Sequence, residues 1–229
     1  YKLNSPDKSP LIVGCIYPDS KGCIWLGTEK DGLFRYNRVT DEFYKEDLSQ
    51  YGVHEMGYIG SIGEDKYDRL WIGHRNGLSV YDYTNNYFKY YMLENSFNIQ
   101  LITIITHIFR TKKQDMVLGT HFTGFFVINE LNSSIKFYNL TEFNNQTGGI
   151  TSNGITIDNQ KHLWAATNCM GISVLDKKGK ILKQINQKNS GINNDILSLE
   201  YDKKGNIWAG SSSAGLYKIC LLYTSPSPR

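Results

Sequence analysis

The side chains that could carry out chemistry in this sequence are its carboxylates and its five histidines. Four aspartates stand at one place in a recurring motif: Asp19, Asp65, Asp158 and Asp202. Two carboxylates act together as general acid and base only when they lie about 5 to 10 Å apart in one cleft. Because these aspartates lie in successive copies of a repeat, they are not expected to share a cleft. We therefore interpret them as turn residues.

Neither metal-binding nor nucleophilic motifs are found in the chain. The histidines show no His-x-x-x-His spacing, and the four cysteines show no Cys-x-x-Cys spacing. No serine elbow and no phosphate-binding loop occurs. The sequence thus predicts no catalytic residue, no metal site and no cofactor.

Composition and charge narrow the range of partners. The chain has 229 residues, of which 40% are hydrophobic and 21% charged, as in a folded protein. Its net charge of +3 is spread along the sequence without a run of Lys or Arg, so no nucleic-acid partner is expected. No apolar run reaches the length of a membrane span, and we expect no membrane contact within this segment.

Five copies of one motif repeat along the chain every 44 to 47 residues. The first anchor of the motif is an aromatic or apolar residue at the centre of a short apolar run: Trp25, Trp71, Val117, Trp164 and Trp208. The second anchor is a glycine that follows the run: Gly32, Gly77, Gly124, Gly171 and Gly215. A period of this length is typical of a propeller blade or a helical array. Because each copy consists of short runs rich in β-branched and aromatic residues, separated by Gly, Asp and Asn, strands are favoured over helices.

Each copy therefore predicts a four-stranded antiparallel meander, and the chain an all-β propeller of five blades, the last incomplete. The blades are expected near residues 11–48, 58–93, 101–140, 150–186 and 195–219. Runs such as Ile24-Trp25-Leu26 are apolar on consecutive residues, which requires cover on both faces of the sheet. We expect the tryptophans and the anchor glycines to form the blade core.

The segment from Asp19 to Tyr36 resembles the two-component regulator propeller repeat of bacterial hybrid histidine kinases, through Asp-x-x-Gly, Ile-Trp-Leu-Gly-Thr and Gly-Leu. The third copy departs most from this pattern, because Thr111 replaces the aspartate and Val117 the tryptophan. The resemblance implies a seven-bladed propeller in the periplasmic part of an inner-membrane receptor, with a small-molecule or oligosaccharide ligand. It also implies that the full receptor forms a homodimer.

The two ends of the sequence suggest a fragment. The fifth copy stops after its third strand, so residues 1–219 predict a partial propeller with two open blade faces, which we expect to aggregate or to exchange blades. Residues 220–229 break the repeat and resemble a translated sequencing adapter. We interpret these ten residues as an artefact.

Candidate ligand contacts come from the loops between the second and third strands, which we expect to share one rim with the connections between blades. These loops carry donors and one aromatic ring at equivalent places: Lys30, His74, Arg75, His121, Phe122 and Asn168. A second candidate is the aromatic connection from Tyr51 to Tyr58, which includes His54. Solvated loop residues would also explain both sets.

Three functions fit this reading. The first is an extracytoplasmic sensor module that detects an oligosaccharide or another nutrient and has no enzymatic activity. The second is a protein-interaction scaffold, which a downstream membrane span and kinase would distinguish from the sensor. The third is a propeller lyase or dehydrogenase. The predicted first-strand residues argue against an enzyme because they are mostly aliphatic or small: Ile12, Gly14, Ile59, Ser61, Ile104, Ile155 and Leu197.

Overall fold

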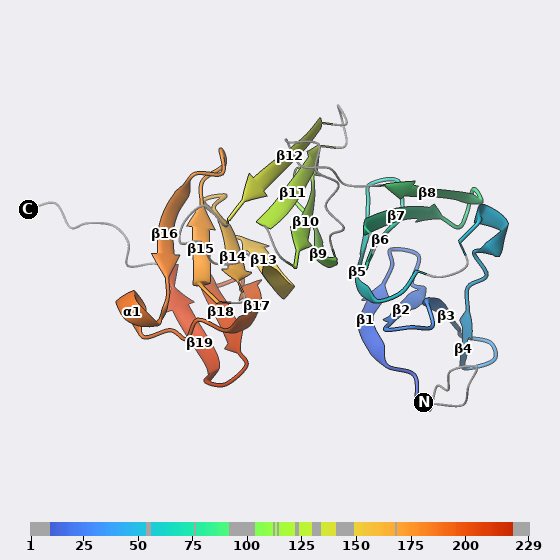
Figure 1. The fold of residues 1–229 in the computed structure, drawn as a ribbon, viewed down its shortest axis with the longest axis horizontal. Helices are drawn as coiled ribbons and strands as arrows, with labels where there is room; N and C mark the ends of the chain where they lie inside the picture. Colours follow the sequence, from blue (N-terminus) through green and yellow to red (C-terminus); the bar gives the residue numbers. More distant parts are fainter. Residues whose placement is uncertain are drawn as a thin grey trace, which may run out of the picture. The chain divides into compact units, whose positions relative to one another are not determined.

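The computed structural model describes residues 10–53, 56–75, 77–91, 104–111, 113, 115–121, 124–129, 134–140, 149–167 and 169–221. These residues form five separate antiparallel sheets in which consecutive strands are neighbours (Figure 1). The chain divides into two compact units, Tyr1–Leu118 with Val127–Phe137 and Gly119–Phe126 with Tyr138–Arg229. Each unit is described by itself.

The strands follow the repeat. The first sheet contains β1 (Val13–Pro18), β2 (Ile24–Thr28), β3 (Leu33–Asn37) and β4 (Glu42–Lys45). The second contains β5 (Ile59–Glu64), β6 (Leu70–His74), β7 (Gly77–Asp82) and β8 (Tyr87–Tyr91). The third contains β9 (Ile105–Arg110), β10 (Met116–Thr120), β11 (Gly124–Asn129) and β12 (Ser134–Asn139). A short 3-10 helix, η1 (Ser49–Tyr51), lies in the connection between β4 and β5.

The fourth sheet contains β13 (Ile150–Ile157), β14 (Leu163–Thr167), β15 (Gly171–Leu175) and β16 (Ile181–Ile185). The fifth contains β17 (Ile196–Tyr201), β18 (Asn206–Ser211) and β19 (Gly215–Cys220). A single helical turn, α1 (Gln187–Ser190), joins the fourth and fifth sheets. The prediction of five meanders with an incomplete last blade is confirmed, and the fold is an all-β propeller. Cys220 ends β19 and pairs with Asn206 of β18, and residues 222–229 lie outside the described residues, so the interpretation of residues 220–229 as an artefact stays a hypothesis.

The first strand of a blade packs against the preceding blade. Within the first unit β1 lies beside β5 and β5 beside β9, and within the second unit β13 lies beside β17. One buried cluster joins Trp25 and Leu33 of the first blade to Ile59 and Ile62 of the second. An equivalent cluster joins the fourth blade to the fifth. The core thus lies between the blades, as the consecutive apolar residues require.

Glycines on the second strand of a blade allow neighbouring sheets to approach each other closely. A Cβ at Gly73 of β6 would lie 2.6 Å from Cγ2 of Ile105 on β9. At Gly27 of β2 a Cβ would overlap Cγ2 of Ile59 and would lie 2.7 Å from Sγ of Cys15. The glycine two residues after the tryptophan, which has no side chain, therefore leaves space for a β-branched side chain of the next blade.

Candidate ligand-binding rim

A hydrogen bond between an aspartate and a tryptophan fixes the turn at one end of a blade. Oδ2 of Asp19 accepts a hydrogen bond from Nε1 of Trp25 at 2.8 Å, and Oδ1 accepts one from the backbone N–H of Cys23 at 2.7 Å. The same indole bond occurs at 2.9 Å, 3.0 Å and 2.8 Å in three further blades, from Trp71 to Asp65, Trp164 to Asp158 and Trp208 to Asp202. The interpretation of the aspartates as turn residues is confirmed, and the tryptophans have a polar role that the sequence analysis did not predict.

These turns place a residue in the left-handed region, where glycine is favoured. Gly22 and Gly205 occupy it as expected, with φ of 78° and 86°. Asp68 and Lys161, which fit the sequence pattern less well, adopt it too, with φ of 59° and 68°. The hydrogen bonds to the preceding aspartate carboxylate hold both turns closed despite the missing glycine.

In the third blade Thr111 takes the place of the aspartate, and its hydroxyl oxygen accepts hydrogen bonds from the backbone N–H groups of Lys113 and Asp115. Val117 replaces the tryptophan and is buried. The turn is thus closed without an indole bond, and the strand pairing of this blade is retained, as predicted.

The hydrogen-bonded turn carboxylates predict a loss of stability in acid. Hydrogen bonds from the Asn206 side chain and backbone hold the pKa of Asp202 well below its ordinary value, and those from the Lys180 backbone lower the pKa of Asp176. A lowered folded-state pKa stabilises the fold above the unfolded-state pKa near 4, and this stabilisation is lost as the pH falls through the folded-state value. We expect the urea midpoint to be lower at pH 3 than at pH 6, and Asp202→Asn to reduce this difference. Equal midpoints for the native chain would contradict the prediction.

At the opposite end of a blade, the loop between the second and third strands meets the segment that precedes the first strand. The backbone N–H of Glu29 donates to the carbonyl oxygen of Ile12 at 2.9 Å, and that of Arg75 donates to the carbonyl oxygen of Tyr58 at 2.8 Å. In the fifth blade the N–H of Ser212 donates to the carbonyl oxygen of Asp195 at 3.1 Å. The prediction that these loops and the connections share one end of a blade is confirmed.

The sequence-predicted ligand contacts are not all equivalent in the structure. Lys30 and Arg75 are exposed on their loops, and His121 is half-buried. Phe122 and Asn168 lie outside the described residues, as does His54. Ligand binding by these residues stays a prediction.

His74 is only 3% exposed and lies within β6 rather than in the loop. It occupies the place of Thr28 and Thr167, whose hydroxyl groups donate to the carbonyl oxygens of the hairpin glycines. The His74 ring instead has Nε2 3.0 Å from Oγ of Ser79, and burial lowers its pKa to about 4. The His74 ring is thus buried within the hairpin, and its contact with a ligand stays a prediction.

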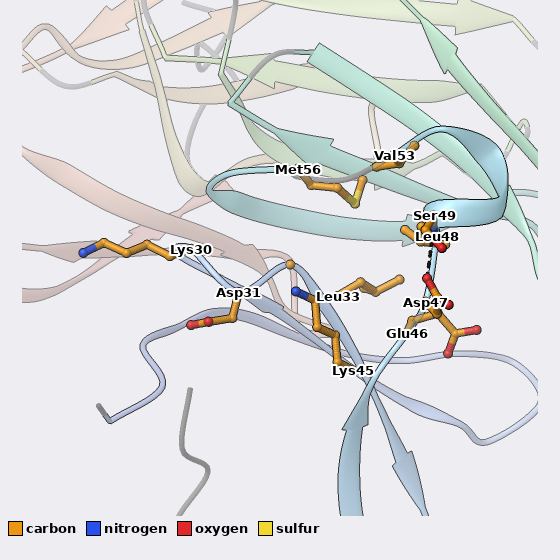
Figure 2. Close-up of a pocket in the computed structure, with 11 residues that line it drawn as sticks. Lys30, Asp31, Leu33, Lys45, Glu46, Asp47, Leu48, Ser49, Val53 and Met56 are labelled. Carbon is orange, nitrogen blue, oxygen red and sulfur yellow. Dashed lines mark hydrogen bonds between the residues drawn. The ribbon is translucent and has the colours of Figure 1, made fainter. Parts of the chain in front are cut away.

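A pocket of about 550 Å³ opens at the rim of the first blade. Its two sides are the turn with Lys30 and Asp31 and the connection from Lys45 to Met56 (Figure 2). Leu33, Leu48 and Met56 are buried and form its apolar floor. Pockets of this size are typical of small-molecule sites. Of the six loop residues predicted as ligand contacts, Lys30 lines this pocket.

Hydrogen bonds order the connection that forms the second side of the pocket. Oε1 of Glu46 accepts a hydrogen bond from the Tyr81 hydroxyl at 2.7 Å, and Oε2 lies 3.5 Å from Nε of Arg35. Oδ1 of Asp47 accepts a hydrogen bond from the backbone N–H of Ser49 at 2.9 Å, drawn as a dashed line in Figure 2. Hydrogen bonds from Ser49 also lower the pKa of Asp47.

The Lys45 side chain projects from β4 toward Leu33 (Figure 2). A Cβ on Gly32 would lie 3.7 Å from Cε of Lys45, so the lysine stem packs across the hairpin that carries Lys30. The pocket therefore combines two ammonium groups, three carboxylates and an apolar floor.

Sequence reasoning missed the part of the pocket between Lys45 and Ser49. It did select the connection from Tyr51 to Tyr58, and Val53 and Met56 of this connection line the pocket. Tyr51 instead stacks on Phe88 with ring centroids 5.5 Å apart. The length of this connection was the available signal, because a connection longer than a tight turn must fold over the end of its blade.

Two segments of the chain match a known repeat family. Residues 8–30 and 190–213 match the two component regulator propeller family. The matched segments include β1 and β2 of the first blade and β17 and β18 of the fifth, so these two blades are similar to repeats of this family. No curated protein sequence matches the chain.

Solved structures confirm the fold. The extracellular domain of BT4673 from B. thetaiotaomicron, described as a hybrid two component system, is 22% identical with a TM-score of 0.75. PorZ of Porphyromonas gingivalis, a surface component of the type-IX secretion system, is 17% identical with a TM-score of 0.72. The matches cover 94% and 95% of this chain but 28% and 33% of the two solved chains. The chain is therefore similar to about a third of these proteins or less.

Within the described part of the chain, no group of three His, Cys, Asp or Glu side chains is placed to hold a metal ion. In the same residues no helix is long and apolar enough to span a membrane.

Proposed function

We propose that this chain is part of an extracytoplasmic, non-enzymatic sensor module of a two-component system, and that it binds an oligosaccharide or another small nutrient. The proposal is supported by the family of the repeat and by the extracellular domain to which the fold is similar. The observation that carries it is the rim pocket of the first blade, where a structural turn would need neither the volume nor the charged lining.

The lining suits a ligand with hydroxyl groups. The ammonium groups of Lys30 and Lys45 donate hydrogen bonds, and the carboxylates of Asp31 and Asp47 accept them. The apolar floor can contact the C–H faces of a sugar ring. Ligand binding would act by favouring one of two arrangements of the receptor, which we propose to be a homodimer in its full-length form.

Thermal unfolding with a panel of defined di- to hexasaccharides tests this function. A saccharide at a hundredfold excess over its Kd is expected to raise Tm by about 5 to 10 °C. Lys30→Ala and Lys45→Ala should reduce the shift because they remove donors from the pocket. Lys183→Ala is the matched control, since this exposed lysine lies on β16 outside the pocket.

Three outcomes would count against parts of the proposal. If no saccharide raises Tm, the ligand class is wrong. If a saccharide raises Tm equally in all variants, the pocket is not its site. Turnover of a bound saccharide would contradict a non-enzymatic module.

A further inference from the structure

The first strand of the fourth blade is longer than the first strands of the other blades. β13 has 8 residues, whereas β1, β5, β9 and β17 have 6 each. Two apolar residues near the start of this strand stand three positions apart in the other blades: Val13 and Ile16, Ile59 and Ile62, Ile105 and Ile108, Ile196 and Leu199. In the fourth blade Ile150 and Ile155 take these places and stand five positions apart. We call residues 151–154 the β13 protrusion.

The extra residues leave the strand and return to it without shifting its packing. From Ile150 to Ile155 the chain advances five residues, while β14 advances only two, from Thr167 to Ala165. A Cβ on Gly119 of β10 would lie 2.8 Å from Cγ2 of Ile150 and 3.2 Å from Cδ1 of Ile155, and both isoleucines are at most 2% exposed. The protrusion is therefore an addition to a complete blade.

The protrusion lies on the inner side of the rim. β13 is an edge strand of its sheet, and the first strands of neighbouring blades lie side by side, as β13 and β17 do. In a propeller this inner side surrounds the central channel. Thr167, which pairs with Ile150, ends β14 and precedes the hairpin loop of the rim. Asn153 is exposed, whereas Thr151 and Gly154 are buried, so the Asn153 amide stands where the rim meets the channel.

The protrusion contains features that destabilise a folded chain. Thr151 is 5% exposed, and its Oγ1 has no hydrogen-bond partner among the described residues, which is unfavourable for a buried hydroxyl. Asn153 has a left-handed backbone with φ of 57°, which residues other than glycine rarely adopt. A Cβ on Gly154 would overlap Oγ1 of Thr151 and lie 2.8 Å from the carbonyl oxygen of Thr151. Local features that cost stability and are not needed to build a blade are expected at functional sites.

We propose that the β13 protrusion is a second ligand-binding element, in which the side-chain amide of Asn153 binds hydroxyl groups of a saccharide. The protrusion contains no charged residue, so it recognises a ligand through hydrogen bonds rather than ion pairs. An asparagine side chain both donates and accepts hydrogen bonds, as neighbouring hydroxyl groups of a sugar do. The ligand class rests on the function proposed above, whereas the place of the element rests on β13 alone.

Two variants test the protrusion. Asn153→Gly removes the amide and introduces the residue that best tolerates a left-handed backbone. Deletion of Ser152 and Asn153 leaves Ile150-Thr151-Gly154-Ile155, which has the spacing of the other four blades. Asn86→Gly is the matched control, because Asn86 is also exposed and has φ of 52°. It lies in the turn between β7 and β8, at the end of the blade opposite to the rim.

Isothermal titration calorimetry measures the binding of the saccharide that raises Tm most in the panel described above. Asn153→Gly is expected to raise its Kd about five- to tenfold, as loss of one neutral hydrogen bond predicts. The deletion should raise the Kd at least as much, and Asn86→Gly should leave it unchanged. The deletion is nevertheless expected to unfold at the native urea midpoint or above it, because it removes the left-handed residue and restores the spacing of the other blades.

A urea midpoint below that of the native chain would show that the two deleted residues are structural and would overturn the proposal. An unchanged Kd for both protrusion variants, or an equal increase for Asn86→Gly, would overturn it as well. In that case weaker binding by Lys30→Ala would leave the proposed function intact. If no saccharide binds the native chain, the proposed ligand class and this inference both fail.

Discussion

Trp71→Ala is expected to lower the free energy of unfolding by about 3 to 5 kcal/mol, the range for a buried aromatic residue truncated to alanine. The Trp71 side chain lies within the second blade and is 6% exposed. Its removal opens a cavity and leaves Oδ2 of Asp65 without the indole donor, although Nε of Arg69 still donates to this oxygen at 2.6 Å. Urea denaturation followed by circular dichroism measures the loss.

Trp208→Ala is the matched control for this change. Trp208 donates an equivalent hydrogen bond to Asp202 but is half-buried, so the change loses the same bond and much less packing. We expect the loss for Trp208→Ala to be less than half of that for Trp71→Ala. Equal losses would show that the indole hydrogen bond, rather than burial between blades, dominates the contribution of the tryptophans.

The strands could be predicted from sequence because their determinants are local and recur. In the fourth blade the apolar run from Leu163 to Thr167 forms β14, and the run from Ile181 to Ile185 forms β16. Each strand coincides with an apolar run, and turn residues within a few positions of the run mark the ends of the strand. Fivefold repetition then distinguished blades from a single sandwich.

The site could be predicted only in part because side-chain direction is not a local property. His74 reads as a loop residue beside Arg75, yet strand β6 extends through it and its ring turns into the hairpin. Because β6 includes His74, the His74 side chain takes a strand position on one face of the sheet rather than a place in the loop. The pocket wall from Lys45 to Ser49 was missed for a different reason, since a single connection has no counterpart in the other repeats to mark it.

The indole bonds were also hidden in the sequence. Each aspartate stands six residues before its tryptophan, as Asp19 does before Trp25, and this spacing was visible. The predicted turn brings the chain back, but the sequence does not show that the two side chains meet across it. In the third blade the aspartate and the tryptophan are both replaced, by Thr111 and Val117. Their joint replacement supports the interpretation that the aspartate and the tryptophan of a blade act as a pair.

Gly27→Val is expected to destabilise the chain by about 1 to 3 kcal/mol, as over-packing of a well-packed core does. Its Cβ would overlap Cγ2 of Ile59, which is fully buried and has no space to move away, and the Sγ of Cys15 would lie 2.7 Å from it. Ala166 stands at the equivalent place in the fourth blade and is buried, so a methyl group can be accommodated when the neighbouring blade is adapted to it. Valine adds two further methyl groups and makes the test stringent.

Gly210→Val separates this inter-blade overlap from the backbone effect of replacing a strand glycine. In the fifth blade the new Cβ would meet the Ser198 hydroxyl alone, and the higher β-propensity of valine then favours the variant. At protein concentrations low enough to keep the chain monomeric, Gly210→Val should unfold at the native urea midpoint or above it, while Gly27→Val unfolds earlier. Equal urea midpoints for the two variants would mean that the blade which carries the glycine, and not the next blade, requires glycine two residues after the tryptophan. The packing of each blade against the next would then not explain why the motif contains glycine at this position.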